Sequence, residues 1–237
     1  MVGVVEDAWI VTLGQNVTLS EDAAMRPAKI ADGVTIGPRS RIAANLSIGV
    51  DAYIAADADV TTSVPAGGIV AGSPAVLIGM RAPLYCHDVV DWQGGVKPLP
   101  VAGVTLVLLP QVSDVRGSLV VGEFGVHVPF AVSRYFMVFG VPDGAVRGGH
   151  AHYRCSQFLL CVRGQCSVIV DDGQQRVEVL LDTPQLGLYL PPMTWGIQYR
   201  YSHDAVLLVF ASHAYDTGDY IRDYHSFLAL RRDSHKV

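Results

Sequence analysis

Two histidines separated by a single residue, His150 and His152, are the side chains of this sequence best suited to proton transfer. They lie in the pattern Gly144-x5-His150-Ala-His152-x4-Gln157-x6-Gly164. Residues two apart on a β-strand point to the same face, so we expect both imidazoles to face the interior of a barrel. Imidazole titrates close to neutral pH, and the pattern therefore predicts general acid–base chemistry that is lost below about pH 6.

The spacing resembles the first sequence motif of the cupin barrels, in which paired histidines, an acid and a second-motif histidine bind a metal. Here Gln157 replaces the acid, and Gly196 stands near where the second-motif histidine is expected. Two neutral imidazoles and an amide form a poor site for a divalent cation. We therefore expect no metal and no other cofactor. A metal-dependent cupin such as a dioxygenase is the less favoured alternative, and a histidine pair with no chemical role stays open.

Short apolar segments after residue 100 form the elements that position these histidines. They are separated by turn residues, and Asp171-Asp172-Gly173-Gln174 has the composition of a hairpin turn. No convincing helix precedes Asp219–Leu230. Eight or more short strands predict an all-β domain, a cupin or jelly-roll β-barrel, over residues 101–237. The strands are expected at residues 104–109, 118–123, 134–139, 158–162, 167–170, 176–181, 186–190 and 205–211.

A six-residue repeat occupies the N-terminal part of the chain. An aliphatic residue recurs at every sixth position and a small residue follows it, which neither a strand nor a helix period explains. The repeat predicts a parallel β-helix over residues 1–80, in which each hexapeptide forms one side of a triangular coil, with an extruded loop at residues 20–29. Proline and glycine at residues 81–100 predict a linker. The repeated aliphatic residues are Ile30, Ile36, Ile42, Ile48, Ile54 and Val60.

Composition excludes several classes of protein. The 237 residues carry a formal net charge of −5, which argues against nucleic-acid binding by bulk electrostatics. The longest apolar stretches are too short to cross a membrane, and the N-terminus lacks the basic segment of a signal peptide. The four cysteines form no CxxC pair and no disulfide framework. We expect a cytoplasmic protein that binds neither nucleic acid nor membrane.

Residues 114–227 resemble the cupin-type sugar-nucleotide 3,4-ketoisomerases, which act on dTDP-4-keto-6-deoxyglucose. The string Arg147-Gly-Gly-His150-Ala-His152 is the specific part of this resemblance. It implies a ketoisomerase that converts a dTDP-linked 4-keto-6-deoxyhexose to its 3-keto isomer, in the biosynthesis of deoxyamino sugars and surface polysaccharides. The other matching segments are 114–120, Pro129-Phe130 with Arg134, 171–173, 186–189, Tyr215-Asp216 and 219–224.

The resemblance also implies roles for single residues. His150 and His152 divide the roles of base and acid, and Arg147 stabilises the enediolate oxygen or holds the hexose. Arg116 and Arg134 are candidates for the diphosphate or are surface residues. Tyr189 and Trp195 stack on the substrate or belong to the core. Gln157 completes the substrate-binding set, while Phe136 and Met137 stand where family members often carry tyrosines.

The repeat segment resembles the left-handed β-helix of hexapeptide-repeat acyltransferases, and the left hand comes only from this resemblance. Gln15 occupies the position of their general-base histidine, so we expect an inactive domain. Such domains usually form trimers, and pairing of the barrels would give a hexamer. Two alternatives stay open. One is a bifunctional enzyme or N-acetyltransferase of the same pathway, and the other is a non-catalytic assembly that binds a nucleotide sugar.

Overall fold

The computed structural model describes residues 11–81, 84–85, 92, 94–142 and 144–233. Parts of three predicted regions lie outside these residues: the start of the β-helix, part of the linker including Cys86, and the last four residues of the barrel domain. The chain divides into two compact units, Met1–Ala82 and Pro83–Val237, which are described separately.

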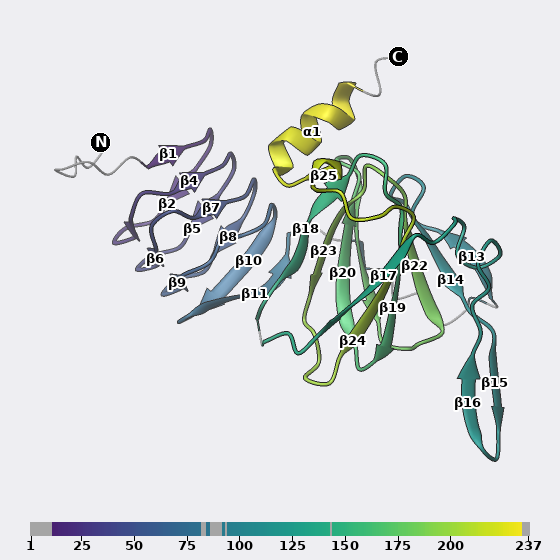
Figure 1. Cartoon of the computed structure of the whole chain (residues 1–237). Helices are drawn as coiled ribbons and strands as arrows, with labels where there is room; N and C mark the ends of the chain where they lie inside the picture. The colour runs from purple at the N-terminus through teal and green to yellow at the C-terminus, as the bar shows by residue number, and fades with distance from the viewer. Residues whose placement is uncertain (1–10, 82–83, 86–91, 93, 143, 234–237) are drawn as a thin grey trace. The chain divides into compact units, whose positions relative to one another are not determined.

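The first unit is a stack of coils built from two-residue strands (Figure 1). The first six strands each pair in parallel with the strand three further along the chain, so that Thr12 of one coil lies beside Lys29 of the next, and Lys29 beside Ser47. One full coil is three hexapeptides, so the six-residue repeat sets the register. The strands are β1 (Thr12–Leu13), β2 (Thr18–Leu19), β3 (Ala24–Met25), β4 (Lys29–Ile30), β5 (Thr35–Ile36), β6 (Arg41–Ile42), β7 (Ser47–Ile48), β8 (Tyr53–Ile54) and β9 (Asp59–Val60).

The repeated aliphatic side chains fill the interior of this solenoid, and each of the six is at most 2% exposed. The third residue after most of them has a positive φ, a left-handed backbone conformation that changes the chain direction at the corner of the coil. These residues are Gly33, Arg39, Asn45, Asp51 and Asp57. Coils approach so closely that a Cβ on Gly49 would lie 2.3 Å from the backbone nitrogen of Ala66. The predicted solenoid is confirmed, and its handedness stays a prediction.

The segment 20–29 is not an extruded loop, and that prediction is wrong. It contributes β3, which pairs with β6 like any other strand of its sheet. The first coil is one residue shorter than three hexapeptides because the stretch between β3 and β4 lacks a residue, and this shift breaks the sequence pattern without breaking the coil. An antiparallel hairpin, β10 (Gly68–Gly72) and β11 (Ala75–Met80), follows the last coil and pairs with β8.

The second unit consists of two six-stranded sheets (Figure 1). One has the strand order β12-β21-β20-β23-β18-β25 and the other β13-β14-β22-β19-β24-β17. Two strands, β12 and β13, come from the stretch 81–100 that was expected to be a linker. The strands are β12 (Leu84–Tyr85), β13 (Gly95–Pro98), β14 (Thr105–Leu108), β17 (Arg134–Phe139), β18 (Arg147–His152), β19 (Gln157–Arg163), β20 (Cys166–Asp171), β21 (Arg176–Leu181), β22 (Leu186–Leu190), β23 (Trp195–Tyr199), β24 (Val206–Ala211) and β25 (Tyr220–Ile221).

The main core of this unit draws on both sheets, with Leu159, Val168 and Leu188 among its fully buried members. A second apolar cluster around Phe158 and Leu160 packs with Phe130. These two sheets form the predicted β-barrel of jelly-roll type. A hairpin, β15 (Gln111–Asp114) and β16 (Gly117–Val120), pairs only with itself and projects from the sheets (Figure 1).

The only helix longer than one turn among the described residues is α1 (Tyr224–Asp233), preceded by a 3-10 turn at Thr217–Asp219. It begins later than predicted because Tyr220 and Ile221 extend the sheet beside β18 as β25. Tyr224 anchors its first turn by donating a hydrogen bond to Asp171 (2.7 Å). In the described part of the chain, no helix combines the length and the hydropathy that crossing a membrane requires.

Candidate active site

Strand β18 carries both histidines on one face. The strand contains a bulge: Gly148 pairs with Ile197 and His150 with Gly196, so Gly149 is the extra residue. Both glycines have positive φ, and a Cβ on Gly148 would lie 2.6 Å from the carbonyl oxygen of Gly196. Glycine is therefore required just before the histidines. The two imidazole centroids lie 5.0 Å apart in an edge-to-face arrangement.

His152 is held from both sides by hydrogen bonds. Its Nδ1 lies 3.1 Å from an Asp219 carboxylate oxygen, and its Nε2 lies 3.3 Å from the amide nitrogen of Gln157. Because the amide nitrogen only donates and the carboxylate only accepts, this network assigns the ring proton to Nδ1. It leaves Nε2 unprotonated, with a lone pair that accepts from Gln157. Both His152 and Asp219 are buried.

Asp219 is fixed in place by the backbone of the loop after β18. Its carboxylate accepts hydrogen bonds from the backbone nitrogens of Arg154 (2.9 Å) and Cys155 (3.1 Å). Burial raises the pKa of this carboxyl, but the donated hydrogen bonds outweigh burial and hold its pKa below the ordinary value. Asp219 is therefore a carboxylate beside the imidazole of His152.

The two histidines have different electrostatic surroundings. Burial, together with the charges of His152 and Arg222, lowers the pKa of His150 to about 4, although a backbone hydrogen bond at Gly148 acts in the opposite direction. Burial also lowers the pKa of His152, but the hydrogen bond and the charge of Asp219 act in the opposite direction. At neutral pH both rings are neutral, and only His152 has an anion ready to stabilise its protonated form.

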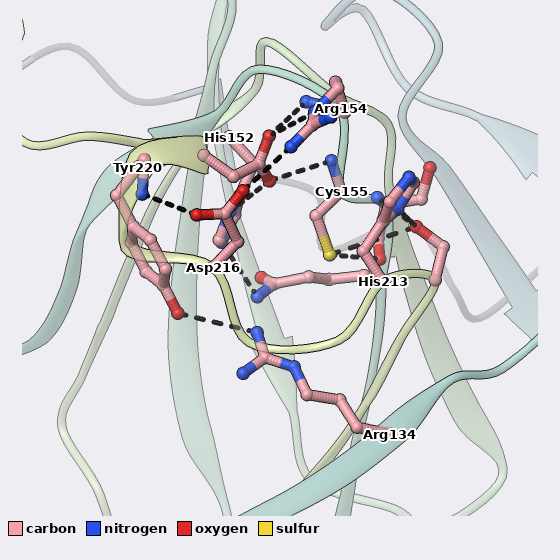
Figure 2. Close-up of polar contacts among 12 residues, drawn as sticks. Arg134, His152, Arg154, Cys155, His213, Asp216 and Tyr220 are labelled. Carbon is pink, nitrogen blue, oxygen red and sulfur yellow. Dashed lines mark hydrogen bonds and ion pairs between the residues drawn. The ribbon is translucent and has the colours of Figure 1, made fainter.

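Three further side chains gather at this pair. The ring of Tyr220 lies with its centroid 4.9 Å from that of His150 and 4.4 Å from that of His152. The guanidinium of Arg222 lies 4.3 Å from the centre of the same ring. The Arg134 guanidinium reaches from β17 to within 3.5 Å of the Tyr220 hydroxyl (Figure 2), and its buried Nε has no hydrogen-bond partner.

A small pocket opens beside the histidines, lined among others by Gln157, Cys155, Leu190 and Gly196. Gly196, the strand partner of His150, adds no side chain to this pocket. The site therefore combines two neutral imidazoles, a fixed carboxylate, a phenol and two guanidinium groups. Such a set can move protons and bind an anionic substrate.

The donor set does not fit the metal centre of a metal-binding cupin. Gln157 is a neutral amide, and glycine occupies position 196. Donor atoms of His152, Cys155 and Asp219 do lie within 4.8 Å of one another. However, the Asp219 carboxylate already accepts two backbone hydrogen bonds and one from His152. We derive no reaction step through a metal.

Four residues of the predicted set have no contact with the histidine pair among the described residues. Trp195 is buried against Tyr224 and Phe227 of α1, because strand alternation points it away from the face that Gly196 occupies. Tyr189 packs near Phe130 in the outer apolar cluster. These two positions match the packing role that the sequence left open.

The other two residues are arginines. Arg116 lies at the tip of the β15–β16 hairpin, exposed and paired with Asp114. Arg147 is exposed at the start of β18. Burial raises the pKa of Tyr201, and the charge of Arg147 opposes this rise. Binding roles for both stay predictions. The structure brings together His150, His152, Gln157 and Arg134.

Sequence reasoning gave no role to Asp219, Tyr220 or Arg222. All three lie in the matched segment Asp219-Tyr-Ile-Arg-Asp-Tyr224, which was noted only as a resemblance. A carboxylate, a phenol and a guanidinium so close together in the chain were a usable signal. The first unit offers no comparable group at its expected acyltransferase position, where Gln15 is exposed and its backbone nitrogen bonds to Asp32.

Comparison with known proteins gives a consistent result for the second unit. Residues 102–232 match the family model described as FdtA: WxcM-like, C-terminal. The chain is 42% identical over 117 residues, 49% of its length and 84% of the relative, to the TDP-4-oxo-6-deoxy-alpha-D-glucose-3,4-oxoisomerase of Aneurinibacillus thermoaerophilus.

Solved structures of ketoisomerases are also similar. A 3,4-ketoisomerase from Helicobacter canadensis superimposes with a TM-score of 0.54 and 31% identity, over 55% of this chain and 98% of that chain. The WlaRB TDP-quinovose 3,4-ketoisomerase from Campylobacter jejuni gives a TM-score of 0.53 and 35% identity, over 54% and 99% of the two chains.

Proposed function

Because the chain belongs to the FdtA, WxcM-like C-terminal family, we propose that its second unit is a sugar-nucleotide 3,4-ketoisomerase. The substrate is a dTDP-linked 4-keto-6-deoxyhexose and the product its 3-keto isomer. The observation that carries the proposal is the pair of neutral histidines backed by Asp219 and surrounded by Tyr220, Arg134 and Arg222.

The reaction moves hydrogen without any change in overall oxidation state. Carbon 3 loses a proton and carbon 4 gains one, while the oxygen on carbon 3 loses a proton and the oxygen on carbon 4 gains one. An enediolate connects the two ketones. The chemistry needs a base that takes a proton from carbon 3 and gives a proton to carbon 4. It also needs positive charge or hydrogen-bond donors at the two oxygens.

His152 is the better base for the carbon-bound proton. When it takes the proton it becomes an imidazolium 3.1 Å from the Asp219 carboxylate, so the new charge is compensated. Among the described residues no carboxylate pairs with His150, and burial lowers its pKa to about 4. We assign His152 the proton transfer between carbons 3 and 4, and His150 the role of a neutral hydrogen-bonding group at the substrate.

Substrate binding follows from the positive charges. Arg134 offers a planar set of donors, including a buried Nε without a partner, and Arg222 adds a second guanidinium nearby. A diphosphate suits such groups. The three described cysteines are free thiols, which supports a reducing compartment such as the cytoplasm.

We further propose that the protein is a homo-oligomer, a trimer through the β-helix and a hexamer when the barrels pair. The barrel offers a pairing surface, here called the β17 stripe, formed by the exposed side chains of Tyr135, Met137 and Phe139. This stripe lies on an edge strand of its sheet. Exposed apolar patches of this kind are typical of interfaces.

The test is to incubate the protein with dTDP-4-keto-6-deoxyglucose in deuterated water and follow the sugar by NMR. We expect a 3-keto product with solvent deuterium at carbon 4. His152→Asn should lower turnover about 10²–10⁴-fold and His150→Asn less, with dTDP affinity nearly unchanged in both. If the wild-type protein binds dTDP but forms no product, the chain is a non-catalytic binding protein and the proposal fails.

A further inference from the structure

A threonine in the pocket beside the histidines has a hydroxyl without a protein partner. Thr194 is 5% exposed and lines this pocket together with His150, His152 and Gln157. Among the described residues, none forms a hydrogen bond with its side-chain hydroxyl. A buried hydroxyl without a partner destabilises the folded protein. Such a group at the wall of a pocket points to a ligand that supplies the missing hydrogen bond.

The backbone holds Thr194 at this place. Met193, the residue before it, has a φ of 59°, a left-handed conformation that is uncommon for a residue with a side chain. Its backbone nitrogen donates a hydrogen bond to the carbonyl oxygen of His152 (2.7 Å), which ties the start of β23 to the end of β18. Thr194 and Gly196 both line the pocket, whereas Trp195 between them packs on α1. The strained turn therefore fixes the hydroxyl on the pocket side of the chain.

The lining of the pocket indicates which part of a ligand it takes. Among the described residues that line it, none carries a carboxylate, an ammonium or a guanidinium group. The guanidinium groups of Arg134 and Arg222, which suit a diphosphate, do not belong to this lining. Leu190 and Pro191 add an apolar wall. Neutral polar groups beside an apolar wall suit the oxygens and the methyl group of a 6-deoxyhexose rather than a phosphate.

We propose that the Thr194 hydroxyl binds an oxygen of the hexose and positions the sugar against the two imidazoles. A hydroxyl both donates and accepts, so it pairs with a sugar hydroxyl as well as with a ketone oxygen. It therefore keeps its contact as the ketone moves from one carbon to the next. Thr194 takes no part in proton transfer, and no covalent bond at its side chain is made or broken. The identity of the sugar rests on the proposed ketoisomerase function.

The test measures how tightly the wild-type protein and Thr194→Val bind dTDP-6-deoxyglucose and dTDP, by titration calorimetry. Valine keeps the shape of threonine and loses the hydroxyl, and a hexose without a ketone binds without turnover. We expect the affinity for dTDP-6-deoxyglucose to fall about tenfold, because a buried hydrogen bond is lost, and the affinity for dTDP to stay within about twofold. With dTDP-4-keto-6-deoxyglucose, kcat/KM should fall about tenfold, mainly through a higher KM.

Two further variants separate binding from folding. Thr194→Ser keeps the hydroxyl and should retain the affinity for dTDP-6-deoxyglucose within about threefold. Thr105→Val is the matched control, since Thr105 is half-buried on β14 in the other sheet and should leave both affinities unchanged. Because the Thr194 hydroxyl has no partner in the described part of the substrate-free protein, Thr194→Val should not lower the thermal unfolding temperature.

Several outcomes would overturn this role of Thr194. They are an unchanged affinity of Thr194→Val for dTDP-6-deoxyglucose, an equal fall in its affinity for dTDP, and a serine variant that binds as weakly as the valine variant. A lower unfolding temperature of Thr194→Val would give the hydroxyl a structural role instead. If the wild-type protein binds the sugar nucleotide but forms no product, the ketoisomerase proposal fails, and the two affinities still decide whether Thr194 binds the hexose.

Discussion

At the scale of single residues, a carboxylate distinguishes the two histidines. His150 and His152 have equal standing in the sequence, both neutral and two apart on a strand. In the structure only His152 is bonded to Asp219, and Asp219 is itself fixed by two backbone nitrogens. The difference between the two rings therefore comes from a residue 67 positions further along the chain than His152.

Asp219→Asn tests this assignment. We expect turnover to fall about 10²-fold, since the imidazolium of His152 loses its anion. The pKa of His152 should fall further, so the remaining activity should persist to lower pH than in the wild-type protein. Asp216→Asn is the control, because Asp216 also pairs with Arg154 but is exposed and does not contact the histidine. A pH–rate profile with an unchanged acid limb would contradict the role of Asp219.

The pH dependence of folding stability follows from the lowered pKa of His150. Its pKa is lowered from 6.5 to about 4 in the folded protein. Between these values the unfolded chain binds the proton and the folded one does not, so stability is fully present above pH 6.5 and is lost as pH falls toward 4. The loss from this residue is about 3 kcal/mol at about 1.4 kcal/mol per pKa unit.

Denaturant unfolding at pH 7 and pH 5 should show about 2 kcal/mol of this loss, because the folded protein protonates fully only below pH 4. His150→Asn should remove most of the difference. Activity should also survive below pH 6, in contrast to the expectation from an unperturbed imidazole, because burial lowers the pKa of both histidines. A sharp fall of activity at pH 6.5 would contradict these shifts.

Metal content is the third test at this scale. We expect the purified protein to hold no stoichiometric transition metal, because Asp219 is already saturated by hydrogen bonds and position 196 lacks a ligand. Elemental analysis after purification without chelator measures it. About one equivalent of zinc, iron or manganese per chain would contradict the expectation and point to His152, Cys155 and Asp219.

At the scale of elements, two repeating patterns build the molecule. In the first unit the parallel register runs from Thr12 to Lys29 to Ser47, one coil at a time, and the same aliphatic position points inward every time. In the second unit alternation along β18 and β23 decides which side chains face the site. His150 and His152 face it, whereas Trp195 packs on α1.

Ile36→Ala tests the coil interior. Ile36 is 0% exposed, and we expect its truncation to destabilise the solenoid by about 2–5 kcal/mol, because a cavity remains. Leu19→Ala is the matched control, since Leu19 is 45% exposed and should change stability far less. Calorimetry of the full chain resolves the two, and equal shifts of the unfolding transition would contradict an interior position for Ile36.

At the scale of the whole molecule, the chain joins two units whose tasks differ. The second unit carries the candidate active site, and the first carries Gln15 where the resemblance to acyltransferases predicts a base. We therefore expect the solenoid to assemble the protein rather than to transfer acetyl groups. An isolated hairpin is marginal in water, so the projecting β15–β16 hairpin also favours contact with a second barrel.

The oligomer test uses mass measurement in solution. We expect the wild-type protein to be a hexamer, and Met137→Glu with Phe139→Glu in the β17 stripe to reduce it to a trimer. Leu180→Glu is the control, because Leu180 is exposed on β21 in the other sheet and the variant adds a carboxylate outside the β17 stripe. A monomeric wild-type protein would contradict both interfaces, and acetylation of a dTDP-amino sugar at an enzymatic rate would contradict the scaffold role.

The sequence by itself determined everything that rests on local periodicity. The six-residue repeat predicts the solenoid because each coil side repeats the same geometry. The spacing of His150 and His152 places both on one face because strand alternation is a local property. The turn at Asp171-Asp172-Gly173 and the barrel class follow in the same way. The extruded loop at 20–29 was wrong because a one-residue deletion shifts the pattern without removing the strand.

Only the tertiary structure decided which distant residues meet. Strand β25 brings Asp219 and Tyr220 to β18, and β17 brings Arg134 to the Tyr220 hydroxyl. Burial then lowers the pKa of His150, and the carboxylate of Asp219 distinguishes His152 from it. Contacts between residues far apart in sequence, and the loss of water around them, are absent from any local pattern. They depend on how the sheets pair and close, and for this reason the different surroundings of the two histidines could not be predicted from the sequence.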